Sequence, residues 1–209
     1  MNQAIQEQPG TKTTERPLYS PGLEGVIAGE SALCQVDEGE AGLRYRGYAI
    51  GDLAKWSRFE EVAYLLLIGH LPTRSKLDSF STLLRGHRVL PDPVQRFIDS
   101  LQPGLHPMDV LRTGISLLGL SDPDAQDGSH EANLRKSMRL LSQIPLLIAH
   151  SYRVMSGILP PRQDESRDFA QHLLHLVAGH KDGESGTAMA QALNVSLILY
   201  AEHEFNAST

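Results

Sequence analysis

The chain has 209 residues, of which 41% are hydrophobic and 21% charged, with a formal net charge of −6 at pH 7. These proportions are those of a globular protein with a substantial core, and an acidic balance without a basic cluster argues against nucleic acid as a partner. A single cysteine, Cys34, excludes an intramolecular disulfide and favours a reducing compartment.

The N-terminal residues are polar and contain helix breakers. Because Pro17 interrupts any helix and no apolar pattern recurs, we expect a disordered arm over 1–20, followed by one domain over 21–209. The arm lacks the basic segment and apolar core of a secretory signal, and no apolar run approaches the roughly 18 residues that span a bilayer. We therefore expect a cytoplasmic protein with no membrane partner.

The first predicted element is a β-hairpin. Residues 33–36 and 43–46 alternate apolar and polar side chains, and the segment 37–42 between them contains glycine. Cys34 lies in the first strand, where a buried, unreactive thiol is the usual state.

From residue 50 onward, apolar side chains recur at helical spacing. Caps and breakers bound the predicted helices, because hydroxyl, carboxylate and proline residues favour helix starts and glycine favours helix ends. The predicted helices are 50–56, the capping-box match Ser57-Arg58-Phe59-Glu60 to Gly69, Thr73 to Gly86, Asp92-Pro93 to Leu101, His106-Pro107 to Gly119, 129–156 with a kink at Pro145, 168–178, and 184 to the end. The sequence thus predicts a mainly α domain with one small hairpin.

The last residues are the most informative stretch. An apolar segment, 193–200, leads into Ala201-Glu202-His203-Glu204-Phe205-Asn206-Ala207-Ser208-Thr209. Polar groups at the end of a rigid, buried support are often held there for catalysis. The alternative is a solvated helix end whose histidine caps the last carbonyls.

Five stretches, spread from residue 22 to residue 209, form a recognisable set. They are Gly22-Leu23-Glu24-Gly25-Val26, Leu43-Arg44-Tyr45-Arg46-Gly47-Tyr48-Ala49-Ile50, Phe59 to Gly69 followed by Leu71-Pro72, His106-Pro107-Met108 with Leu111-Arg112-Thr113, and 201–209. Together they resemble the citrate synthase family, which includes 2-methylcitrate synthase. They follow the family's order, and the last is similar to the active-site segment of bacterial members.

The resemblance implies a citrate synthase-like fold of large-domain helices with a small N-terminal β-hairpin. It also implies that this is the N-terminal part of the large domain, with the small domain absent and with it a second catalytic histidine and the catalytic aspartate. The implied activity is acyl transfer: acetyl-CoA or propionyl-CoA condenses with oxaloacetate to give citrate or 2-methylcitrate and CoA. Acyl-CoA is then a co-substrate, no cofactor is tightly bound, and the isolated chain is expected to lack measurable activity.

Two histidines receive roles from this resemblance. His203 matches a family histidine that donates a hydrogen bond to the thioester oxygen and so stabilises the enol, where charge develops. His172 lies where family members hold oxaloacetate and is expected to contact that substrate, although Phe169 and His172 stand where histidine and asparagine are common. The alternative for His172 is a place on the polar flank of an amphipathic helix. We expect His106 to be structural, with its ring bonded to backbone.

A non-catalytic helical module is the main alternative function. The helices beginning at His106 and Ser129 carry long apolar faces that fit a core or a partner surface, and the resemblance places them at a two-fold interface. We therefore expect a homodimer, or pairing with a C-terminal synthase fragment, and such a chain would act through partner association.

A metal hydrolase is the second alternative. His172 and His175 share one helical face, and His180 follows closely. Ala207, however, stands where a zincin helix needs its second histidine, and one cysteine cannot supply paired thiolate ligands. We therefore expect no metal site.

Overall fold

The structure, a computed structural model, describes residues 30–36, 42–159, 161, 164, 166–179 and 183–203. Contacts divide the chain into two units, residues 1–31 and 32–209, and every element named below belongs to the second. The predicted arm over 1–20 lies outside the described residues. None of the helices in these ranges combines the length and apolar character that crossing a membrane requires.

The hairpin prediction is confirmed, and the structure adds a third strand. Strands β1 (Cys34–Val36), β2 (Leu43–Tyr45) and β3 (Tyr48–Ala49) form an antiparallel sheet in the order β1-β2-β3. The β2–β3 turn has two residues, Arg46 and Gly47, with φ of 48° and 86°. Two positive φ values mark a type I′ turn, which matches the twist of its strands. Cys34 is only partly buried, contrary to expectation, because it lies on an edge strand.

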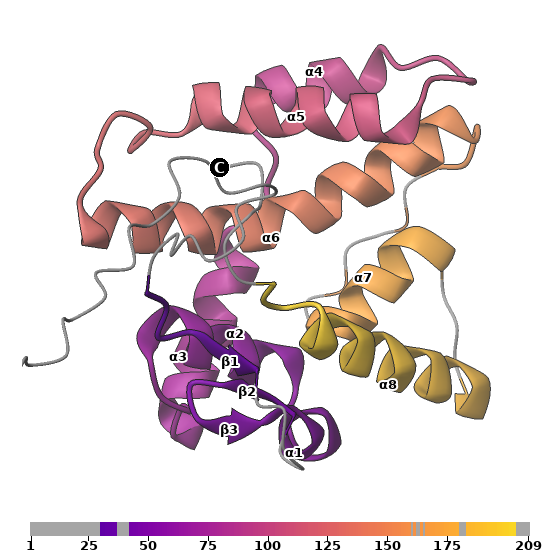
Figure 1. Cartoon of the computed structure of the whole chain (residues 1–209). Helices are drawn as coiled ribbons and strands as arrows, with labels where there is room; N and C mark the ends of the chain where they lie inside the picture. The colour runs from indigo at the N-terminus through magenta and orange to yellow at the C-terminus, as the bar shows by residue number, and fades with distance from the viewer. Residues whose placement is uncertain are drawn as a thin grey trace, which may run out of the picture. The chain divides into compact units, whose positions relative to one another are not determined.

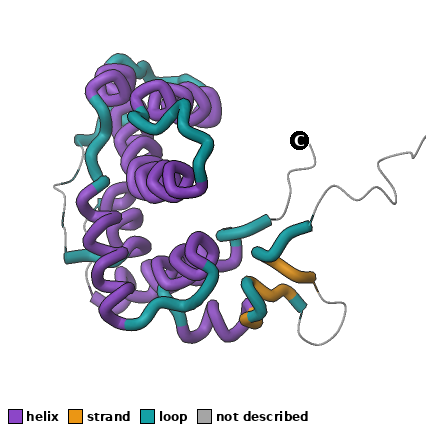
Figure 2. Tube along the Cα trace, turned by 90° about the vertical axis from the view of Figure 1, so that its left-hand side faces the viewer, coloured by secondary structure: helices purple, strands orange, loops and turns teal. Residues whose placement is uncertain are grey.

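Eight helices follow in the described residues, and they dominate the structure (Figures 1 and 2). Their starts and ends agree with most of the predicted caps: Thr73 and Ser129 accept from backbone amides at helix starts, and Gly69 ends a helix with φ of 103°. The helices are α1 (Ile50–Trp56), α2 (Phe59–Ile68), α3 (Arg74–Gly86), α4 (Asp92–Asp99), α5 (Pro107–Ser121), α6 (His130–Met155), α7 (Phe169–Ala178) and α8 (Gly183–Leu199).

The predicted capping box at the start of α2 is displaced by one residue. Ser57 ends α1, and Arg58 is the N-cap of α2, with its backbone amide donating to Glu61 at 2.8 Å. Glu60, which was expected to close the box, instead points into the interior. The start of α4 is also displaced, with Pro91 as N-cap.

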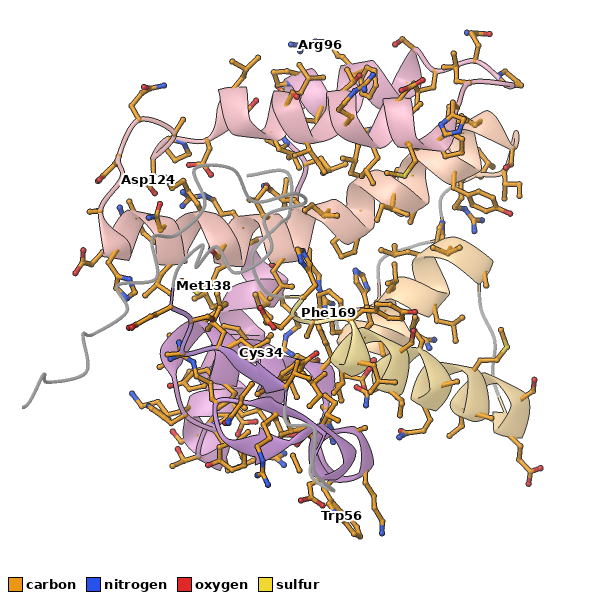
Figure 3. The ribbon with its side chains drawn as sticks, in the orientation of Figure 1. Cys34, Trp56, Arg96, Asp124, Met138 and Phe169 are labelled. Atoms are coloured by element: carbon orange, nitrogen blue, oxygen red, sulfur yellow. The ribbon has the colours of Figure 1, made fainter. Side chains whose placement is uncertain are left out.

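Helix α6 contains Pro145, and in Figure 1 its two halves run in different directions. A proline inside a helix removes one backbone bond and kinks the axis, as predicted. In the N-terminal half of α6, Arg139 pairs with Asp122 and Asp124 at 2.7 and 2.6 Å, which ties the loop before the helix to the helix. Figure 3 shows Asp124 at this end of α6.

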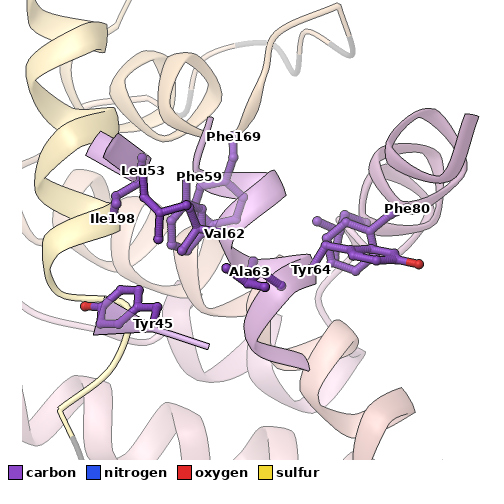
Figure 4. Close-up of a cluster of buried hydrophobic side chains, with 11 residues drawn as sticks. Tyr45, Leu53, Phe59, Val62, Ala63, Tyr64, Phe80, Phe169 and Ile198 are labelled. Atoms are coloured by element: carbon purple, nitrogen blue, oxygen red, sulfur yellow. The ribbon is translucent and has the colours of Figure 1, made fainter. Parts of the chain in front are cut away.

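The core has two main hydrophobic clusters. The first joins the sheet to α1, α2, α3, α7 and α8, and Figure 4 shows its members: Tyr45, Leu53, Phe59, Val62, Ala63, Tyr64, Leu65, Phe80, Leu84, Phe169 and Ile198. The second lies among α4, α5 and α6 and consists of Val94, Ile98, Leu101, Val110, Leu118 and Leu147. The prediction of a mainly α domain with one small sheet is confirmed.

Candidate active site

The C-terminal end of α8 carries the predicted catalytic histidine. The helix ends at Leu199, earlier than expected. Tyr200 N still makes the α-helical bond to Ser196 O at 3.1 Å, but Ala201 N donates to Ile198 O at 3.3 Å, the three-residue spacing of a tightened last turn. His203 follows in non-helical conformation and is exposed. Its ring is therefore accessible rather than packed in the interior. Asn206, Ser208 and Thr209 lie outside the described residues.

Tyr45 holds the end of α8. Its side chain is fully buried, and its hydroxyl donates to the Leu199 carbonyl oxygen at 3.1 Å. The backbone amide of Glu202 donates to the same hydroxyl. Burial raises the pKa of Tyr45, so the hydroxyl keeps its proton at neutral pH. One of the carbonyls that a helix-end histidine was expected to cap is thus bonded by a tyrosine from the sheet.

The two histidines of α7 lie in the interior. His172 is 3% exposed and His175 8%, so His172 is not on a polar flank as the alternative interpretation had it. Burial, with a contribution from the Arg88 cation, lowers the pKa of His172 to about 4, so the ring is neutral at pH 7. Neither ring nitrogen of His172 has a hydrogen-bond partner among the described residues.

Buried polar side chains fix the starts of α2 and α7. Glu60 accepts from the Phe169 amide at 2.7 Å. Asn194, on α8, accepts from the Phe59 amide at 2.8 Å and donates to the Ser57 carbonyl at 3.1 Å. No local sequence pattern indicates these contacts, because the partners are more than a hundred residues apart in the chain. They bring α2, α7 and α8 together.

The other end of α7 is held by Arg153 of α6. Its guanidinium donates to the carbonyl oxygens of Leu159, Leu176 and Val177 at 2.6, 3.4 and 3.3 Å. The last carbonyls of a helix have no partner within the helix, and a cation there also complements the helix dipole. Arg153 thus caps α7 from a neighbouring helix.

His106 has the structural role predicted for it. It is the N-cap of α5, and its Nδ1 accepts from the Met108 amide at 3.3 Å. Close by, α5 and α6 enclose an apolar cavity of about 520 Å³ whose lining includes Met108, Ile148 and Tyr152. All three side chains are exposed, so this part of the predicted association surface faces solvent.

The metal hydrolase alternative has no supporting geometry within the described ranges. No group of three histidine, cysteine, aspartate or glutamate side chains there is placed to hold a metal ion. His180, the third histidine of that alternative, lies outside the described residues.

Residues 22–209 match the family model for the citrate synthase C-terminal domain. The chain belongs to the citrate synthase family, and the resemblance drawn from the sequence is confirmed. It is 41% identical over 195 residues to the 2-methylcitrate synthase of Shewanella oneidensis, covering 93% of this chain and 50% of that protein. It is 37% identical over 196 residues to the citrate synthase of Mycolicibacterium smegmatis, covering 94% of this chain and 51% of that one.

Solved structures agree with this assignment. The citrate synthase of Pyrobaculum aerophilum superposes with a TM-score of 0.79 at 28% identity, covering 97% of this chain and 53% of that chain. The citrate synthase of Thermoplasma acidophilum, solved as a ternary complex with carboxymethyl coenzyme A and oxaloacetate, gives 0.78 at 25% identity, covering 91% and 49%. The chain therefore spans about half the length of the relatives it matches.

Proposed function

We propose that this chain supplies part of the active site of a citrate synthase-type acyltransferase. The reaction joins the α-carbon of acetyl-CoA or propionyl-CoA to the ketone carbon of oxaloacetate, and water then cleaves the thioester to release citrate or 2-methylcitrate and CoA. Support comes from the names of the relatives and from the ligands of the Thermoplasma acidophilum complex. The observation that carries the proposal is the accessible ring of His203, held just beyond the anchored end of α8.

The difficult step is removal of a proton from carbon beside a thioester. It requires a base at the C–H bond and a hydrogen-bond donor at the carbonyl oxygen, where negative charge develops. In this proposal His203 is that donor. The base and the donor for the oxaloacetate ketone are not assigned to described residues of this chain.

His172 is the proposed second contact, to oxaloacetate. A neutral imidazole whose two nitrogens lack partners among the described residues can both donate to and accept from a polar ligand. Because the ring is covered, this role requires α7 to move when substrate binds.

Cytoplasmic location stays a prediction from the sequence.

A second candidate function is association without catalysis. The exposed Met108, Ile148 and Tyr152 around the apolar cavity on α5 and α6 favour it, since apolar patches of this kind mark protein contacts. This surface fits a second copy of the chain or a complementary synthase fragment, and it is compatible with the catalytic proposal.

The catalytic proposal is tested by His203→Ala in a full-length synthase containing this sequence, or in the chain combined with a C-terminal synthase fragment. Thiol release that needs both acyl-CoA and oxaloacetate should fall about 10²–10³-fold, as loss of an oxyanion donor typically causes. His70→Ala, at another exposed histidine, serves as the control. Wild-type turnover in His203→Ala would refute the assignment.

Exchange of the acyl α-hydrogen with solvent separates enol formation from condensation. His203→Ala should suppress this exchange if the ring acts on the thioester oxygen. Unchanged exchange with a raised KM for oxaloacetate would instead place His203 on the keto acid.

A further inference from the structure

The contact between the sheet and the end of α8 points to a role that goes beyond the proposed function and rests on it. We propose that Tyr45 is a positioning residue for His203. Its hydroxyl binds the chain on both sides of the turn after α8 and so fixes the position of the backbone that leads into His203. Tyr45 contacts no substrate in this proposal. It acts through the backbone that carries the histidine.

The hydroxyl of Tyr45 makes two bonds to one short segment. It donates to the carbonyl oxygen of Leu199, the last residue of α8, at 3.1 Å, and it accepts from the amide of Glu202. Glu202 immediately precedes His203. The two bonds therefore close a loop of four residues onto one oxygen atom, and His203 is the first residue beyond it.

The anchor itself is rigid. Tyr45 is fully buried in the cluster that contains Leu53, Phe59 and Ile198, and its strand is paired on both edges, opposite Cys34 on β1 and Tyr48 on β3. Neighbouring side chains and strands therefore hold the Tyr45 ring in place. Figure 4 shows Tyr45 beside the end of the α8 ribbon, with its oxygen directed toward that helix.

Backbone bonds also hold the start of this segment. Beyond Leu199 the helix retains only the bonds from Tyr200 to Ser196 and from Ala201 to Ile198 among its described backbone bonds. A helix end without side-chain partners frays within its last turn. Catalysis by a positioned donor is sensitive to this, since a misplacement of about 1 Å can cost on the order of 10²-fold in rate.

The test is Tyr45→Phe, which removes both bonds and leaves the ring in the core. Tyr64→Phe is the matched control, because Tyr64 is buried in the same cluster and its hydroxyl makes no hydrogen bond within the described residues. Backbone ¹⁵N order parameters of residues 200–203 are measured in both variants of the 209-residue chain. We expect a fall from about 0.85 to below about 0.6 in Tyr45→Phe and none in Tyr64→Phe. Unchanged order in Tyr45→Phe, or an equal loss in both variants, would overturn the proposal.

Kinetics provide the second readout, in the same full-length or complemented enzyme used for His203. Tyr45→Phe should lower kcat about tenfold with KM for both substrates unchanged, since the tyrosine orders the donor and binds nothing itself. A rise in KM with unchanged kcat would also overturn it. If His203→Ala retains wild-type turnover, the proposed function fails, whereas the order parameters still decide whether Tyr45 holds the segment.

Discussion

The carboxylate of Glu60, on α2, accepts a hydrogen bond of 2.7 Å from the backbone amide of Phe169, the first residue of α7. The adjacent rings of Phe59 and Phe169 pack with centroids 4.7 Å apart. A buried amide at a helix start has no partner within its own helix, so this contact satisfies a donor that would otherwise be unpaired. It makes the start of α7 dependent on a side chain from α2.

Glu60→Ala should lower the free energy of unfolding by about 1–3 kcal/mol, because the Phe169 amide is left buried without an acceptor. Urea unfolding measures the change. Burial raises the pKa of Glu60, and its second oxygen has no partner among the described residues, so a neutral side chain suits the site. Glu60→Gln keeps an acceptor and should retain most of the stability. Glu131→Ala, at an exposed glutamate in α6, is the control, and equal losses at positions 60 and 131 would contradict this prediction.

His172 should make stability depend on pH. Its pKa is lowered from 6.5 to about 4 in the folded state, so below pH 6.5 the unfolded chain takes up a proton that the folded chain does not. Stability is therefore full above pH 6.5 and is lost as the pH falls toward 4, at up to about 1.4 kcal/mol per pH unit. In His172→Gln the slope of unfolding free energy between pH 6.5 and 4 should be smaller. His70→Gln, at an exposed histidine, should leave it unchanged; a slope identical in all three proteins would count against the prediction.

Gly114 allows α5 to approach α6 closely. A Cβ atom there would lie 2.5 Å from Cδ1 and 2.7 Å from Cδ2 of Leu147, whose side chain is fully buried and cannot give way freely. Gly114→Ala should therefore destabilise the fold by about 1–3 kcal/mol through overpacking. Gly119→Ala, in the same helix with open space around it, should instead stabilise by about 0.5–1 kcal/mol. Thermal unfolding of the two variants gives both signs, and a stable Gly114→Ala protein would disprove the close contact.

The apolar surface on α5 and α6 predicts self-association. Met108→Glu and Ile148→Glu place charge at the rim of the cavity and should shift the chain toward monomer in light scattering over a range of concentrations. Leu159→Glu changes an apolar residue that is 85% exposed, against 61% for Met108 and 41% for Ile148, and that does not line the cavity; it is the control. A wild-type chain that stays monomeric at every concentration would remove the basis for this prediction.

Local signals in the sequence identify most helices correctly. The caps at Thr73, Ser129 and Asp168 and the breaker at Gly69 act within a few residues, so their effect can be read from spacing alone. Glu60 shows the limit of this reasoning. It has the spacing of a capping box, yet its partner is 109 residues away, and only the folded chain brings the two together.

The candidate site follows the same division. The position of His203 at the end of an apolar helix could be predicted, because the change from buried to polar residues is local. Tyr45 could not be connected to it, since one aromatic residue in a strand carries no signal of its partner on the last helix. The burial of His172 was also missed, because amphipathic spacing places a residue on a face but does not reveal which neighbours cover that face.

Helix α6 packs against each hydrophobic cluster of the core. Met138 and Leu141, before Pro145, contact the first cluster, and Ile144 and Leu147, around the proline, belong to the second. A helix bent at this point can serve both without a break in the chain. Because the two clusters share α6, we expect them to unfold together, and calorimetry should record a single cooperative transition rather than two.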